Sequence, residues 1–172
     1  MKRVGLALLL LAGCDEATVI THVDRDVSID GSDLVAMQTG GGIATEIHGT
    51  PFEGVEPETL LAALRPPAGS AQGVKWRPIG FGQAAHGTRM VLHFNPLGAP
   101  NPAADCRFEA EVETGPARAE GFDVTLSFCK GTRAEAHGHL KALKVAPGDL
   151  EAYSQAMRQL LNAIFNEAGS ER

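Results

Sequence analysis

Two histidines that stand two residues apart are candidates for metal chemistry in this sequence. His137 and His139 lie in a segment with the pattern of a β-strand, so both imidazole rings would point to one face of a sheet. Imidazole is a common ligand of zinc and copper, and His86 or His93 could add a further ligand. Because the spacing provides no fixed third ligand, we expect solvated histidines here and no resident metal ion.

A calcium-binding loop begins near the N-terminus but is not completed. Asp26, Ser28 and Asp30 alternate ahead of Gly31, as in the first half of an EF-hand loop. The twelfth position is Met37, which cannot supply the bidentate carboxylate that such a loop requires. We therefore expect an acidic turn at this place and no calcium site.

Motifs of known catalytic sites are missing from the sequence. It contains no GxSxG, no HExxH and no phosphate-binding loop, and Gly80-Phe81-Gly82 lacks the third glycine of a dinucleotide fingerprint. We therefore expect a protein that is not an enzyme and needs no cofactor. A hydrolase is an alternative, and it would require a deep pocket that holds His86 or His93 beside a carboxylate.

The N-terminal residues have the pattern of a processed export signal. Lys2 and Arg3 precede an apolar run over residues 4–11, which is far shorter than the roughly 20 residues of a membrane-spanning helix. Leu11-Ala12-Gly13-Cys14 closes this run and resembles the lipobox of bacterial lipoproteins. In that family the cysteine thiol receives a diacylglycerol and the preceding peptide bond is cut. The resemblance implies that Cys14 is the lipidated first residue of the mature chain.

The lipobox resemblance implies a domain attached to the bacterial cell membrane and facing the periplasm. An ordinary signal peptide or an N-terminal core helix would leave the position of Cys14 unexplained. Acyl chains contribute about 0.8 kcal/mol per buried methylene, so two or three chains on Cys14 make attachment persistent. Asp15 resembles the residue that keeps lipoproteins at the inner membrane, and the outer membrane is the alternative.

The remaining two cysteines form an even pair once Cys14 is assigned to lipid. In an oxidising compartment we expect Cys106 and Cys129 to form a disulfide, which would stabilise the fold by roughly 3 to 4 kcal/mol on the chain-entropy model. The alternative is a reactive thiol that a nearby histidine activates.

Length and charge fit a single folded domain behind this anchor. The chain has 172 residues and a formal net charge of −6, which argues against binding to nucleic acid or to anionic lipid headgroups. We expect residues 1–13 to be a removed signal peptide, residues 14–32 to be the lipidated N-terminus and tether, and residues 33–168 to form one periplasmic domain.

Alternating apolar residues predict an antiparallel sheet. We expect short strands over residues 34–38 and 43–48, and further strands over 76–81, 89–95 and 133–145. Pro57 begins a short helix that ends before Pro66.

A hairpin is expected around the turn at Gly115 and Pro116. Residues 107–113 and 122–128 both alternate, so the two segments should pair with the cysteines at their open end. If the apolar residues of both segments face the same side of the sheet, Cys106 lies opposite Lys130 and not opposite Cys129. A bulge or a bent strand end would then be needed to bring the two cysteines together.

The C-terminal segment has the most regular pattern. Its apolar residues recur at spacings of three and four and form one helical face: Leu150, Tyr153, Met157, Leu160, Leu161, Ile164 and Phe165. Asp149 can cap this helix and Gly169 can end it. We expect the helix to pack on one face of the sheet, with partner binding as the alternative. The predicted fold class is therefore α+β, an antiparallel sheet with a short helix and a C-terminal amphipathic helix on one face.

Part of the domain is similar to small envelope lipoproteins of alphaproteobacteria. The similarity covers residues 89–96, Cys106, residues 126–131 and the C-terminal helix, and it implies no activity. The anchor, the cysteine pair and the missing catalytic motifs predict a non-catalytic binding or assembly factor whose partner is another envelope protein. A lipoprotein that binds a small molecule or a metal ion is the alternative.

Overall fold

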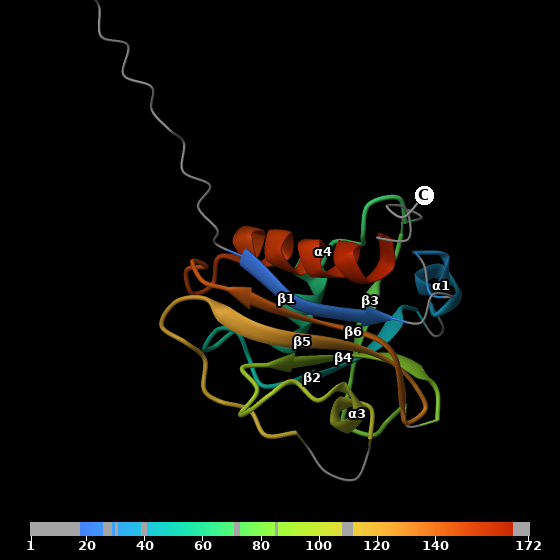
Figure 1. The fold of residues 1–172 in the computed structure, drawn as a ribbon. Coiled ribbons are helices and arrows are strands. Elements are labelled where there is room, and N and C mark those ends of the chain that lie inside the picture. The colour runs from blue at the N-terminus through green and yellow to red at the C-terminus, as the bar shows by residue number, and fades with distance from the viewer. Residues whose placement is uncertain are drawn as a thin grey trace, which may run out of the picture.

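A six-stranded open sheet forms the centre of the protein (Figure 1). The computed structural model describes residues 18–25, 29, 31–38, 41–70, 73–84, 86–107 and 112–166. The strands and helices follow the order β1 (Thr18–Arg25), α1 (Gly31–Ala36), β2 (Ile43–His48), α2 (Pro57–Ala63), β3 (Trp76–Ile79), β4 (Thr88–Phe94), α3 (Pro102–Asp105), β5 (Phe122–Lys130), β6 (Arg133–Ala142) and α4 (Leu150–Asn166). The order across the sheet is β1-β6-β5-β4-β2-β3.

The sheet is mixed, with one parallel region. β2 runs parallel to both β3 and β4, whereas the pairs β4 with β5, β5 with β6 and β6 with β1 are antiparallel. Parallel neighbours need a crossover connection, and α2 lies in the connection between β2 and β3. The structure confirms the predicted α+β class, but the prediction of a wholly antiparallel sheet was wrong at β2.

Helix α4 packs on one face of the sheet, as the sequence predicts (Figure 1). It contacts β6 and β1, and α2 contacts α4. Between the helices and the sheet lies the main core, to which β4 and β5 contribute completely buried residues at alternate positions: Met90, Leu92, Phe94, Phe122, Val124 and Leu126. The Asp149 side chain accepts a hydrogen bond from the amide of Ala152 at 3.0 Å and so caps α4. Gly169 lies outside the described residues.

The hairpin expected between residues 107–113 and 122–128 is not the arrangement found. β5 lies between β4 and β6 along its length, with Phe128 opposite both Met90 and Ala136. Only Gly131 and Thr132 connect β5 to β6, so β6 is the local hairpin partner and β4 occupies the other edge. Residues 108–111 lie outside the described part of the chain.

Two predictions near the N-terminus were also wrong. The segment expected as a strand over residues 34–38 belongs largely to helix α1, in which Leu34 is completely buried. The expected tether over residues 14–32 contains strand β1, which pairs with β6 at the edge of the sheet. A β-bulge between Ile20 and His22 breaks the alternation of β1, which explains why the pattern does not reveal the strand.

Candidate functional site

The face of the sheet opposite α4 is polar and largely buried. Strands β2, β4, β5 and β6 direct eight polar residues to it, all of them at most 9% exposed: Glu46, His48, Arg89, His93, Asp123, Thr125, Ser127 and His139. Helix α3 contacts β5 and β6 and covers part of this face. Because a buried charge without a partner is costly, the ionisable side chains among them should be paired. The Thr125 hydroxyl makes no hydrogen bond with the described residues.

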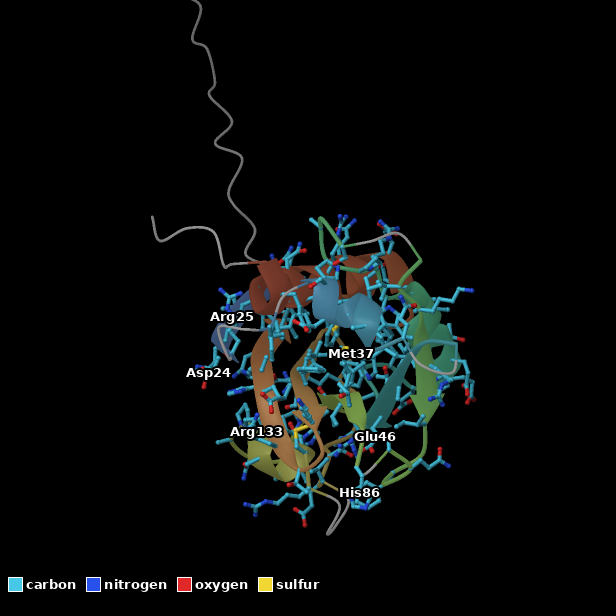
Figure 2. The ribbon with its side chains drawn as sticks, turned by 90° about the vertical axis from the view of Figure 1, so that its right-hand side faces the viewer. Asp24, Arg25, Met37, Glu46, His86 and Arg133 are labelled. Carbon is cyan, nitrogen blue, oxygen red and sulfur yellow. A yellow bond between two sulfur atoms is a disulfide. The ribbon has the colours of Figure 1, made fainter. Side chains whose placement is uncertain are left out.

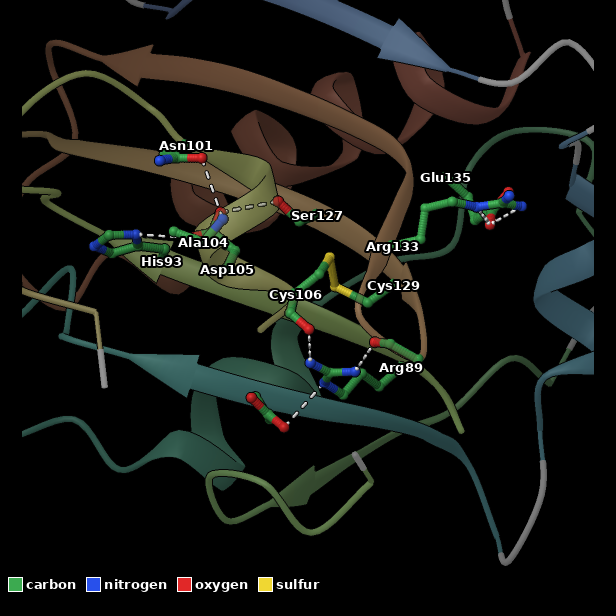
Figure 3. The surroundings of a disulfide bond; sticks show 12 residues. Arg89, His93, Asn101, Ala104, Asp105, Cys106, Ser127, Cys129, Arg133 and Glu135 are labelled. Carbon is green, nitrogen blue, oxygen red and sulfur yellow. Dashed lines mark hydrogen bonds and ion pairs between the residues drawn. A yellow bond between two sulfur atoms is a disulfide. The ribbon is translucent and has the colours of Figure 1, made fainter. Parts of the chain in front are cut away.

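A disulfide holds α3 against this face (Figure 3). Cys106 follows α3 as its C-cap residue and is bonded to Cys129 of β5, with the Cα atoms 5.4 Å apart. Both residues are completely buried beside Val91. The expected cysteine pair is confirmed, and a reactive thiol at these positions is not present. Cys106 lies at a helix end instead of in the expected hairpin, and the pairing of β5 with β6 has a bulge or irregularity between Phe128 and Cys129.

His93 of β4 lies in a network with an aspartate and a serine (Figure 3). Its Nδ1 atom is 3.1 Å from Oδ1 of Asp105, and the Ser127 hydroxyl donates to Oδ2 of the same carboxylate at 2.9 Å. The His93 Nε2 atom is 3.1 Å from the carbonyl oxygen of Glu113. All three networked side chains are buried, so the network fixes the position of α3 over the sheet.

This network contains the residue types of a hydrolytic triad in a different order. In a serine hydrolase the histidine lies between serine and aspartate and accepts the serine proton. Here Asp105 lies between Ser127 and His93, and both nitrogens of His93 face other oxygen atoms. His93 and Asp105 line a pocket of about 410 Å³, but Ser127 is not among the lining residues. This pocket places His93 beside a carboxylate, and the hydroxyl of Ser127 donates to that carboxylate from outside the pocket lining.

An arginine and a glutamate form a completely buried ion pair beside the disulfide. The Arg89 Nε atom is 3.0 Å from Oε1 of Glu46, and both side chains are at most 1% exposed. Arg89 also donates to the carbonyl oxygens of Gly131 at 2.8 Å and Cys106 at 2.9 Å. Burial lowers the pKa of Arg89, although the Glu46 carboxylate acts in the opposite direction. The guanidinium therefore links β4 to β2, to the β5–β6 turn and to the end of α3.

His139, one of the two predicted metal candidates, is engaged on both sides of its ring. Its Nε2 atom contacts Oδ1 of Asp123, and its Nδ1 atom lies against the Thr21 hydroxyl. Burial of Asp123 opposes its ionisation, but His139, Lys141 and Arg118 outweigh this effect, so the pKa of Asp123 lies below its ordinary value. His139 is therefore part of a structural network and is not available to a metal ion.

His137, the other candidate, lies next to residues that sequence reasoning missed. Asp24 of β1 is directly opposite His137 in the β1–β6 ladder, and the rings of His22 and His137 have centroids 5.0 Å apart. The ligand atoms of His22, Asp24 and His137 all lie within 4.8 Å of one another. Burial and then the nearby His22 lower the pKa of His137, against the effect of Asp24 and Asp105. The expected further ligands, His86 and His93, are not in this cluster.

The metal candidate opens onto a groove of about 760 Å³. Asp24 and His137 line it together with three arginines from separate parts of the chain: Arg25, Arg107 and Arg133. Asp24 and Arg25 project at the end of β1, and Figure 2 shows Arg133 on the same side of the molecule. Arg133 pairs with Glu135, and Arg25 donates to the carbonyl oxygen of Ile164 at 3.3 Å.

The lipidation candidate Cys14 lies outside the described residues. None of the helices described by the structure combines the length and the apolar character needed to cross a bilayer. Comparisons with known protein families, with curated proteins and with solved structures found no match to this chain.

Proposed function

We propose that the protein is a lipid-anchored periplasmic lipoprotein of the bacterial envelope, whose domain binds another envelope protein without catalysing a reaction. The hydrogen-bond partners of His93 are the observation that supports the non-catalytic part of this proposal. Both of its nitrogens face internal oxygen atoms, and the neighbouring Ser127 hydroxyl donates to Asp105 instead of to an imidazole. A nucleophile needs a base that can take its proton, and this arrangement does not supply one.

The lipobox and the cysteine pair support the envelope location. Leu11-Ala12-Gly13-Cys14 resembles the acceptor site for a diacylglycerol, and the Cys106–Cys129 bond is of the kind that persists in oxidising compartments. Only four residue steps separate Cys14 from Thr18, where β1 begins. A lipid on Cys14 would thus hold the domain close to the bilayer, where acylation raises the local concentration of a membrane-associated partner.

Metabolic labelling with a fatty acid tests the anchor. The intact chain should incorporate label and partition with membranes, whereas Cys14→Ser should do neither. The matched control is the double variant C106S/C129S, which removes the other two cysteines and should still be labelled. Label on Cys14→Ser, or none on the intact chain in its bacterial host, would contradict the proposed lipid anchor.

Affinity capture of the acylated protein from envelopes tests the binding role. We expect a co-purifying envelope protein whose recovery falls with Cys14→Ser, because detachment from the membrane lowers its local concentration. Assays of the pure chain with ester and peptide substrates test the non-catalytic part. Turnover that His93→Gln abolishes while the fold is retained would show that the protein is an enzyme.

A further inference from the structure

We propose that His22, Asp24 and His137 form a binding site for one divalent transition metal ion such as Zn²⁺. The site joins two strands that the sheet topology brings together, and it does not depend on the proposed lipid anchor. Two imidazole nitrogens and one carboxylate oxygen are a donor set that zinc accepts, with water completing the coordination.

The antiparallel ladder between β1 and β6 places the three side chains. Asp24 is directly opposite His137, and His22 is two residues from Asp24 along β1. Directly opposed residues have Cβ atoms about 5 Å apart, and diagonal neighbours remain within reach of an imidazole ring. The three ligands therefore lie on a regular part of the sheet, whose backbone limits their relative movement.

The bulge in β1 gives His22 and Asp24 the same face as His137. Ile20 and Val23 both pack against the main core, although three residue steps separate them. A regular strand would direct these two side chains to opposite faces, and the bulge between Ile20 and His22 corrects the phase. Bulges that redirect a side chain are common beside functional sites. Here the redirected residues are a histidine and an aspartate.

The ligand atoms are close enough for a metal ion to draw them together. They lie within 4.8 Å of one another, and donors around tetrahedral zinc are roughly 3.3 Å apart when the bonds are about 2.0 to 2.1 Å long. Closing this difference needs only small rotations of the side chains. His22 and Asp24 are exposed and His137 is half-buried, so these rotations meet little obstruction.

His22 and His137 contact each other through their rings, and among the described residues neither their side chains nor that of Asp24 are held by a hydrogen bond or an ion pair. His93 and His139 contact oxygen atoms through both ring nitrogens, and His48 lies 3.5 Å from the Glu46 carboxylate. Within the described part of the chain, His22, Asp24 and His137 form the one such cluster of three potential ligands. A metal ion would therefore bind here without displacing a hydrogen bond between described residues.

The test is a calorimetric titration of the full-length Cys14→Ser chain with Zn²⁺ in detergent. This background removes a thiol that could itself bind zinc. We expect saturation at about one equivalent, with at least tenfold weaker binding for His22→Gln, Asp24→Asn and His137→Gln, since even residues that only support metal ligands change affinity by about 10- to 100-fold. Circular dichroism should show the same fold for all variants, because the changed side chains are not buried.

His86→Gln is the matched control, because His86 is an exposed histidine that Figure 2 shows well apart from Asp24. It should bind zinc like the parent chain. In nitrogen-detected spectra, zinc should shift the ring resonances of His22 and His137 more than those of His139. The absence of a saturable site would overturn the proposal. So would unchanged affinity in His22→Gln and His137→Gln, or an equal loss in the control.

Discussion

Within the described part of the chain, buried carboxylates lie beside basic side chains. The buried partners are Glu46 with Arg89, Asp105 with His93, and Asp123 with His139. Burying one charge costs several kcal/mol unless an opposite charge and hydrogen bonds compensate, so each partner makes the other tolerable. Removal of one member should therefore cost more stability than the pair itself contributes.

Asp123 should make the stability of the protein sensitive to acid. Its pKa lies below the ordinary value, so its contribution is complete above about pH 4 and is lost as the pH falls through the pKa of the folded state. We expect Asp123→Asn to lower the free energy of unfolding by about 1 to 3 kcal/mol at pH 7. In urea denaturation, the difference between the two proteins should shrink between pH 5 and pH 2.

The exposed Glu151 provides a control for this measurement. It pairs with Arg65 at 2.6 Å, but the carboxylate side chain is 56% exposed. Glu151→Gln should change the free energy of unfolding by less than about 1 kcal/mol at pH 7. A pH-independent difference between the intact protein and Asp123→Asn would contradict the role given to the Asp123 carboxylate.

Glu46 should be among the most sensitive positions of the chain. Glu46→Gln leaves the buried Arg89 guanidinium without its counter-charge, and we expect a loss of about 3 to 5 kcal/mol in denaturant unfolding. The double variant E46L/R89M removes both charges and should cost less than Glu46→Leu and Arg89→Met added together. Additive effects in this double-mutant cycle would show that the two groups are not coupled.

Some residues of the candidate site can be predicted from the sequence, but the way in which they come together cannot. The cysteine pair follows from a count, and His137 follows from its spacing to His139. His22 and Asp24 were missed because their meeting with His137 depends on which strand fills the sheet edge beside β6. Short-range patterns contain no information on that choice, because the residues concerned are far apart in the sequence.

Elements with one apolar face were the easiest to predict. The alternation in β4 and β5 and the helical spacing in α4 each identify the side that is buried. The partners of a strand are harder to predict, since residues 107–113 show the same alternation as β5 and were expected to pair with it. Two residues connect β5 to β6, which favours a hairpin between these strands. β4 pairs with the other edge of β5.

The contact between α4 and β6 depends on a residue without a side chain. A Cβ atom at Gly138 would lie 2.8 Å from Leu160 Cδ1 and 3.0 Å from Ile164 Cδ1. Gly138→Val should therefore displace α4 and lower the free energy of unfolding by about 1 to 3 kcal/mol. Thermal unfolding should show this loss.

A smaller residue at position 160 can test whether crowding against Leu160 causes the loss of stability in Gly138→Val. Leu160→Ala alone should destabilise the protein by about 2 to 5 kcal/mol through the cavity it leaves. In the combined variant G138V/L160A, the valine should occupy part of that space, so the combined loss should be smaller than the sum. An additive result would show that crowding at Leu160 is not the origin of the effect.

At the scale of the whole molecule, the sheet order places β1 and β3 at opposite edges. Five strand spacings separate them, which is about 24 Å at the usual 4.8 Å per spacing. If Cys14 holds a lipid, we expect the β1 edge to lie nearer to the bilayer than the β3 edge does.

Fluorophores at two sites of similar exposure can measure this orientation. Val19 in β1 and Phe81 just beyond β3 are 36% and 37% exposed. On the acylated protein in vesicles, a label on Val19→Cys should be quenched strongly by a lipid with a quencher in its headgroup, and a label on Phe81→Cys only weakly. Equal quenching at the two sites would contradict an orientation with the β1 edge nearer to the bilayer.

If Cys14 holds a lipid, the start of β1 at Thr18 also limits how far the domain can move from that lipid. Four residue steps reach at most about 14 Å even when the backbone is fully extended. Such a short linker would leave the domain little freedom to rotate or to move away from the membrane. A binding partner would have to present its contact surface within roughly one domain diameter of the lipid headgroups. A longer linker of glycine and serine residues would widen that zone.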